Sequence, residues 1–158
     1  MLNAIDEKLK ALRPSVFIVV MTILSVVIVL PFLPILHALE EIGGPVGGPS
    51  LVEESLVFQF VVAVLLAPLI ETLIFQTAPI LILRKYSSAR PGLIVLVSSL
   101  WFAVLHDYDI AYIFYAFLVG LTLAYSYVMY LEKTASAFWV VTAIHALRNL
   151  LYLILSNV

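Results

Sequence analysis

Cysteine is absent from this chain of 158 residues, and charged residues make up only 11% of it. Without thiols the chain can form no disulfide, no thiolate metal site and no cysteine nucleophile. The net charge of −2 provides no basic surface, so no nucleic-acid partner is expected. Hydrophobic residues make up 64% and the mean hydropathy is +1.16, more apolar surface than a soluble domain of this size can bury. The chain is therefore predicted to be an all-α polytopic membrane protein whose surroundings are the lipid bilayer.

Charged residues and helix breakers divide the chain into five apolar segments, which we interpret as transmembrane helices. They cover residues 14–39, 51–84, 91–106, 110–131 and 135–157. Together they are expected to form a single membrane domain, with the first span followed by a core over 51–158. Ahead of the first span, residues 1–13 carry apolar side chains at helical spacing, which predicts a short helix on the membrane surface.

The second segment carries signals for both its start and its shape. Ser50 and Glu53 form a capping-box pattern, which predicts the start of a helix. Further along, Pro68 and Pro79 predict kinks, because proline lacks an amide hydrogen and clashes with the preceding turn.

Lysine and arginine alternate between the two ends of the predicted spans. The N-terminus and the second and fourth links together hold seven basic residues, whereas the first and third links and the C-terminus hold none. By the positive-inside rule, the N-terminus is predicted to be cytoplasmic and the C-terminus external. The small size and the lack of a soluble domain favour a prokaryotic plasma membrane.

Glu71 is the only ionisable residue between Ser55 and Leu83, within the stretch APLIETLIFQTAP. An unpaired carboxylate there would cost several kcal/mol. At about 1.5 Å per residue from the cytoplasmic ends, four polar side chains share one slab of the membrane. The estimated depths are ~18 Å for Glu71, ~23 Å for His106, ~14 Å for His145 and ~20 Å for Asn149.

Each of these four residues also has a structural explanation when taken singly. A protonated glutamate, a histidine or an asparagine can bond to a neighbouring helix. Their shared depth favours a functional site instead, because together they supply a base, two imidazoles and an amide.

The sequence lacks the residue patterns that metalloproteases, aspartic proteases and serine proteases use in catalysis. No His-Glu-x-x-His motif is present, no aspartate lies inside a predicted span, and no intramembrane serine has a Gly-x-Ser-Gly setting. Glutamate with histidine acting on water remains, since a buried carboxyl has a raised pKa and can act as a general base.

Three short motifs resemble those of the CPBP family, the CaaX-type prenyl proteases or Abi proteins, which are glutamic intramembrane proteases. They are ETLIFQ at 71–76, FAVLH at 102–106 and HALRN at 145–149. The family patterns are Glu-Glu-x-x-x-Arg, Phe-x-x-x-His and His-x-x-x-Asn, in this order on successive helices. The resemblance covers about residues 55–158.

The resemblance implies a role for each matching residue. Glu71 and His106 would activate water, His145 and Asn149 would hold the oxyanion, and Phe102 would line the site. The implied activity is that of an endopeptidase acting on a peptide or protein substrate at the membrane, with no cofactor and no metal. The sequence makes no prediction of oligomeric state.

Two positions depart from the family pattern. Thr72 stands where the second glutamate is usual, and Gln76 where arginine is usual. Because the two positions are four residues apart, we expect a neutral hydrogen-bonded pair in place of an ion pair on one helix face.

Arg148 is unusual because it lies deep in the fifth segment. Three explanations are open. It could snorkel outward, pair with an acid such as Asp107, or hold the C-terminal carboxylate of a substrate, and the structural explanations are preferred.

Two other functions compete with a protease. A catalytically silent family member could act as a bacteriocin-immunity or scaffold protein, and a small metal or proton transporter could use Glu71, His106 and His145 as ligands or as a relay.

Overall fold

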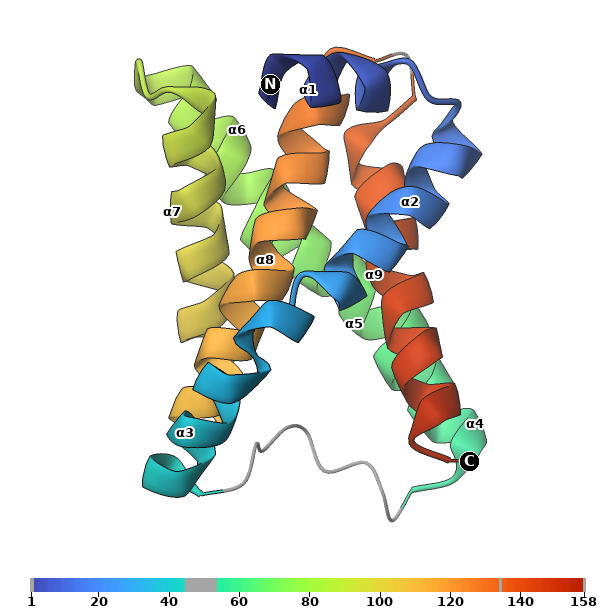
Figure 1. The fold of residues 1–158 in the computed structure, drawn as a ribbon. Helices are drawn as coiled ribbons and strands as arrows, with labels where there is room; N and C mark the ends of the chain where they lie inside the picture. Colours follow the sequence, from blue (N-terminus) through green and yellow to red (C-terminus); the bar gives the residue numbers. More distant parts are fainter. Residues whose placement is uncertain (1, 45–53, 134, 158) are drawn as a thin grey trace.

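The computed structural model describes residues 2–44, 54–133 and 135–157, and the regular structure over these ranges is helical throughout (Figure 1). The expected all-α fold is confirmed. In chain order the elements are α1 (Leu2–Lys10), α2 (Pro14–Val27), η1 (Leu30–Phe32), α3 (Leu33–Gly43), α4 (Leu56–Gln59), η2 (Phe60–Leu66), α5 (Ala67–Glu71), η3 (Thr72–Thr77), α6 (Ala78–Tyr86), α7 (Pro91–Val104), α8 (Ile110–Tyr130) and α9 (Ala137–Leu155).

Four helical stretches are long and apolar enough to cross a membrane. They are Pro14–Gly43, Leu56–Tyr86, Ile110–Tyr130 and Ala137–Leu155. The third expected segment forms the shorter apolar helix α7, whose 14 residues extend for about 21 Å. The two chain ends lie at opposite ends of the bundle in Figure 1, as an odd number of passes requires. The protein is an integral membrane protein.

The first segment is interrupted, whereas the sequence predicted one span over 14–39. Helix α2 ends at Val27, and the 3₁₀ turn η1 joins it to α3, which extends to Gly43. Pro31 and Pro34 lie in the turn and in the first turn of α3. Neither residue can donate a backbone hydrogen bond, so the α-helical register is broken there.

The second segment begins later than predicted. The capping-box residues Ser50 and Glu53 lie outside the described residues, so that prediction is not tested. Helix α4 begins at Leu56, and Ser55 caps it by accepting a hydrogen bond from the amide of Phe58 at 3.3 Å.

The predicted kinks at Pro68 and Pro79 take the form of two π-helical stretches, η2 and η3. The residue before each proline donates its amide hydrogen five positions back, from Ala67 to Val62 and from Ala78 to Leu73. This wider turn makes room for the proline ring, which would clash with the carbonyl four residues earlier. Glu71 ends the short α-helical stretch between the two π-helices.

Each proline frees a carbonyl oxygen that a side chain from another helix then satisfies. Ala63 lies five residues before Pro68, and its carbonyl accepts a hydrogen bond from the amide of Asn149 at 2.9 Å. Phe75 lies four residues before Pro79, and its carbonyl accepts one from the hydroxyl of Ser98 at 2.6 Å. Prolines are tolerated inside membrane helices when a partner of this kind is present. The same two bonds tie the kinked segment to α9 and to α7.

Helix α8 is the central element of the bundle. In its most apolar stretch of 18 residues, 56% of the residues are buried, against 22% to 33% in the corresponding stretches of the other three long helices. Gly120 allows α7 to approach it closely, because an added Cβ would lie 3.2 Å from the backbone of Ser99 and 3.3 Å from the ring of Phe102. Small residues permit such close contact between membrane helices.

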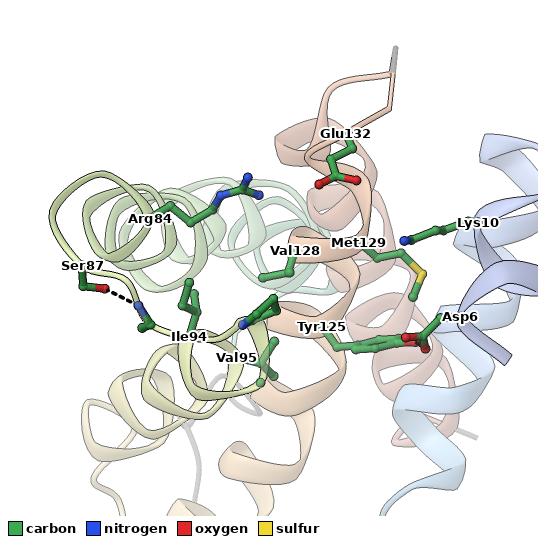
Figure 2. Close-up of a pocket in the computed structure, with 13 residues that line it drawn as sticks. Asp6, Lys10, Arg84, Ser87, Ile94, Val95, Tyr125, Val128, Met129 and Glu132 are labelled. Atoms are coloured by element: carbon green, nitrogen blue, oxygen red, sulfur yellow. Dashed lines mark hydrogen bonds between the residues drawn. The ribbon is translucent and has the colours of Figure 1, made fainter. Parts of the chain in front are cut away.

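Helix α1 lies across one end of the bundle (Figure 1), as expected of an interfacial helix. The hydroxyl of Tyr125 on α8 donates to Asp6 at 2.5 Å, and Lys133 donates to the carbonyl of Lys10. A cavity of about 570 Å³ lies beside these contacts (Figure 2), with Arg84 and Glu132 also in its lining.

Candidate active site

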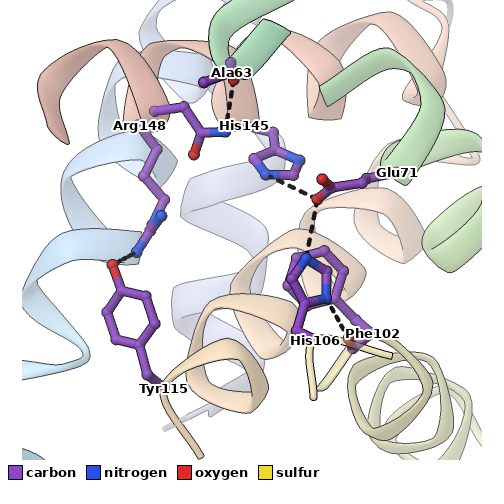
Figure 3. A network of polar contacts seen from close by, with 8 residues as sticks. Ala63, Glu71, Phe102, His106, Tyr115, His145 and Arg148 are labelled. Carbon is purple, nitrogen blue, oxygen red and sulfur yellow. Dashed lines mark hydrogen bonds and ion pairs between the residues drawn. The ribbon is translucent and has the colours of Figure 1, made fainter. Parts of the chain in front are cut away.

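The structure brings Glu71 together with His106 and His145, which come from three different parts of the chain (Figure 3). One carboxylate oxygen, Oε2, lies 3.4 Å from Nε2 of His106 and 3.6 Å from Nε2 of His145. Both distances exceed the 2.7–3.2 Å of a good hydrogen bond. Catalytic contacts are often long in the absence of substrate and tighten when it binds.

His106 lies just beyond the end of α7, in the turn that follows Val104. Its amide donates to the carbonyl of Ala103 at 3.0 Å, and its Nδ1 lies 2.6 Å from the carbonyl oxygen of Phe102. A carbonyl only accepts hydrogen bonds, so Nδ1 must carry a hydrogen. This bond fixes the ring and directs Nε2 toward Glu71.

His145 lies in the middle of α9 and is almost entirely buried, with 3% of its surface exposed. Its Nε2 faces Glu71, while its Nδ1 has no hydrogen-bond partner among the described residues. The helix backbone and the surrounding side chains therefore hold this ring in place, rather than a second hydrogen bond.

Phe102 supports both imidazole rings. Its ring centroid lies 4.1 Å from that of His106 in a tilted stack and 5.9 Å from that of His145 in an edge contact. Phe75 packs edge-on against Phe102 at 5.6 Å and against His106 at 5.7 Å. This aromatic packing restricts the rotation of both imidazoles. Phe75, which takes part in it, is also the residue whose backbone carbonyl loses its helical donor at Pro79.

Asn149 lies one turn after His145 on the same face of α9. Its Nδ2 donates one hydrogen to the carbonyl of Ala63. An amide group carries two hydrogens on this nitrogen, so a second one remains for another acceptor. The bond to Ala63 fixes the plane of the amide.

Arg148 adopts neither arrangement that the structural explanations predicted. It is only 9% exposed, so it does not snorkel outward, and the ion pairs of the described residues include none between it and Asp107. Instead, its Nη2 donates to the hydroxyl of Tyr115 on α8, and its guanidinium lies 5.0 Å from the centroid of that ring. The side chain of Arg148 faces α8 and not the loop that carries Asp107, so the predicted ion pair does not form.

Thr72 and Gln76 do not form the predicted hydrogen-bonded pair. Both side chains are fully buried, and their polar atoms have no hydrogen-bond partner among the described residues. The prediction assumed α-helical geometry, in which positions i and i+4 stack. Both residues belong to the π-helix η3, where the wider turn changes which side chains face one another.

A cavity of about 220 Å³ opens beside these side chains. Its lining includes the candidate residues Glu71, Phe102, His106, His145 and Asn149, together with Ala63, Tyr112, Tyr115 and Arg148. Neither Thr72 nor Gln76 contributes to it. The site thus holds an acid–base group, two imidazoles, an amide and a guanidinium around one space.

Among the described residues, no group of three or more histidine, cysteine, aspartate or glutamate side chains is placed to hold a metal ion. The arrangement offers acid–base chemistry by Glu71 and His106, and hydrogen-bond donation by His145 and Asn149.

Comparison with protein families matches residues 53–151 to the family described as type II CAAX prenyl endopeptidase Rce1-like. The chain belongs to this family. The resemblance to the CPBP proteases is thereby confirmed, and the activity of the family is proteolysis of the CAAX-protease type at the membrane. Neither a curated protein nor a solved structure matches the chain.

Three features of the site were not predicted from the sequence. Tyr112 and Tyr115 were not among the predicted site residues, yet both line the cavity. The carbonyl of Ala63 gave no side-chain signal, although its place five residues before Pro68 marks it as a backbone acceptor left without a donor.

Proposed function

We propose that this chain is an intramembrane glutamic endopeptidase. It hydrolyses a peptide bond in a membrane-associated peptide, or in a lipidated or C-terminally tagged protein. Membership of the Rce1-like family supports the reaction class. The geometry around Glu71 supports the mechanism.

A single observation carries the proposal: one oxygen of an intramembrane glutamate lies within 3.6 Å of two imidazole nitrogens, beside a cavity. A carboxylate at this depth in a membrane is energetically costly, and ionisable residues that are kept there usually belong to functional sites. The bond from Nδ1 of His106 to Phe102 and the packing of Phe102 on both rings hold the three groups in one arrangement.

Glu71 and His106 activate the water. Glu71 takes a proton from a water molecule as the water oxygen attacks the carbonyl carbon of the substrate, and the Nε2 of His106 orients that water. The carbon–nitrogen bond of the tetrahedral intermediate then breaks. The proton held by Glu71 passes to the leaving amine, which regenerates the carboxylate.

His145 and Asn149 stabilise the negative charge that develops on the substrate oxygen. Nε2 of His145 and the second hydrogen on Nδ2 of Asn149 are the donors. Both come from one face of α9, and the contact with Ala63 holds the amide before substrate arrives. Donors fixed in advance in a dry site contribute more than the same groups in water, about 10²–10³ in rate for one donor.

The test is cleavage by purified protein in lipid nanodiscs, using quenched-fluorescent peptides with and without an S-farnesyl cysteine near the C-terminus. Glu71→Gln should lower kcat by about 10³ or more, because an amide cannot take the proton. His106→Gln should lower it by about 10²–10⁴. Helix α3 provides matched controls, since Glu41 and His37 form an exposed pair at 4.0 Å, outside the cavity. Glu41→Gln and His37→Gln should leave the rate unchanged.

Two outcomes would reject the proposal. A folded wild-type protein that cleaves none of these peptides, nor membrane proteins of its host, would indicate the silent immunity or scaffold protein. Cleavage that survives Glu71→Gln would place the chemistry elsewhere.

A further inference from the structure

Arg148 carries a charge in a part of the protein where a charge is costly. It lies on the membrane-spanning helix α9 with 9% of its surface exposed. Guanidinium groups stay protonated in proteins, so the positive charge persists at this depth. Charged residues inside membrane spans usually pair with a partner or serve a ligand or ion pathway.

The ion pairs of the described residues include none that involves this guanidinium. Within the described part of the chain, the guanidinium contacts Tyr115, through the hydroxyl and through the face of the ring. Its Nε is buried and has no hydrogen-bond partner among the residues that the structure describes. A guanidinium carries five N–H donors, and one hydroxyl acceptor leaves most of them unused.

The guanidinium belongs to the cavity that holds the candidate catalytic groups. Arg148 and Tyr115 line the same space as Glu71, His106 and His145 (Figure 3). Arg148 follows His145 by three residues, so the two side chains leave neighbouring positions on α9. An anion bound at Arg148 would therefore lie beside the peptide bond that faces Glu71.

We propose that Arg148, oriented by Tyr115, binds the C-terminal carboxylate of the substrate and so places the cut close to the end of the peptide. This inference rests on the proposed protease function. A planar guanidinium can donate two parallel hydrogen bonds to a carboxylate, and the bound carboxylate removes the uncompensated charge. Tyr115 holds the guanidinium plane from one side and leaves its other donors for the substrate.

The spacing on α9 limits how far the carboxylate lies from the cut. Three residues of helix rise by about 4.5 Å. An extended peptide advances by about 3.3 Å per residue. The carboxylate is thus about one to two residues beyond the scissile bond.

The experiment compares peptides that differ only at their C-terminus. Each quenched-fluorescent peptide, farnesylated or not, is made as a free acid and as a C-terminal amide. Wild-type protein should prefer the acid by about 10- to 100-fold in kcat/KM, the range expected for a charge-assisted hydrogen bond. Arg148→Gln should reduce this preference to about 3-fold or less, because it should lower cleavage of the acid more than cleavage of the amide. Tyr115→Phe should weaken the preference partly, and Arg84→Gln, in the other cavity, should keep it.

A role in folding alone would lower the cleavage of acid and amide equally, so it would not change their ratio. Equal cleavage of both peptides by the wild type would overturn the inference while leaving the protease function intact. So would a preference for the acid that Arg148→Gln retains.

A second measurement separates failure of this inference from failure of the proposed function. Fluorescently labelled versions of the same peptides are titrated against Glu71→Gln, which should bind without cleaving. Tighter binding of the acid, lost in the double variant Glu71→Gln/Arg148→Gln, would support the inference even if the wild type cleaved nothing. Equal or undetectable binding of both forms would reject it.

Discussion

Ser98 makes the hydrogen bond that replaces the one Pro79 cannot donate, and its removal should destabilise the protein measurably. Ser98→Ala deletes the hydroxyl that lies 2.6 Å from the carbonyl of Phe75, in a position with no exposed surface. Stranding a buried carbonyl costs about 1–3 kcal/mol, and hydrogen bonds between membrane helices measure about 0.6–1.7 kcal/mol. We expect a loss of about 1–1.5 kcal/mol in the free energy of unfolding.

Ser99 is a matched control on the same helix. It is also fully buried, but its hydroxyl donates to Val95 within α7, at 2.7 Å. That carbonyl keeps its ordinary backbone donor when the hydroxyl is deleted, so Ser99→Ala should cost no more than about 0.5 kcal/mol.

Pro79→Ala completes a double-mutant cycle. Alanine restores an amide hydrogen four residues after Phe75, which can take over the carbonyl. Ser98→Ala should then cost about 1 kcal/mol less in the Pro79→Ala background than in the wild type. The assay is reversible unfolding in mixed micelles, followed by tryptophan fluorescence. Equal costs for Ser98→Ala in the two backgrounds, or a cost for Ser99→Ala as large as that for Ser98→Ala, would refute this account of the proline.

Three further predictions follow from the sequence and the packing. Cysteine-specific labelling of single cysteines added at each end should place the N-terminus inside and the C-terminus outside, and labelling of both ends from one side would mean that the passes are miscounted. Thr72→Val and Gln76→Leu remove unpaired buried polar atoms, so each should keep or raise the unfolding free energy and leave cleavage within about tenfold; a loss as large as that of Glu71→Gln would instead place position 72 in the chemistry. Gly120→Ala should push α7 away from α8, which should lower the free energy of unfolding by about 1–3 kcal/mol and should also lower kcat. An unchanged unfolding free energy together with an unchanged kcat would contradict the close approach of the two helices.

The meeting of Glu71, His106 and His145 could be predicted because polar residues are rare in this sequence. Each lies in or next to an apolar segment whose length fixes its depth. Three polar side chains at one depth avoid the lipid by facing the interior of the bundle, where they meet one another. The segments themselves were predictable for the same reason, as runs without charge.

The backbone register inside those segments could not be predicted in the same way. Side-chain periodicity does not distinguish a π-helical turn from an α-helical turn over six or seven residues, so the relation between Thr72 and Gln76 was predicted with the wrong geometry. The contact between Arg148 and Tyr115 depends on how α8 and α9 rotate against each other. Helix α8 carries seven aromatic residues, and the sequence gave no reason to select Tyr115 among them as the partner of Arg148. The break in the first span had a visible signal, Pro31 and Pro34, within an otherwise uniform apolar run.

The two π-helical stretches on either side of Glu71 also bear on insertions and deletions in this segment. A π-turn holds about one residue more than an α-turn, and one residue of α-helix corresponds to a rotation of about 100°. Because the π-turn takes up its extra residue locally, deleting one residue from Phe60–Leu66 and replacing Pro68 would let that stretch close to an α-helix without such a rotation, so α4 would keep its facing and Glu71 its place against the histidines. Related chains can therefore differ in length by one residue within this membrane helix and still aim the glutamate into the same cavity.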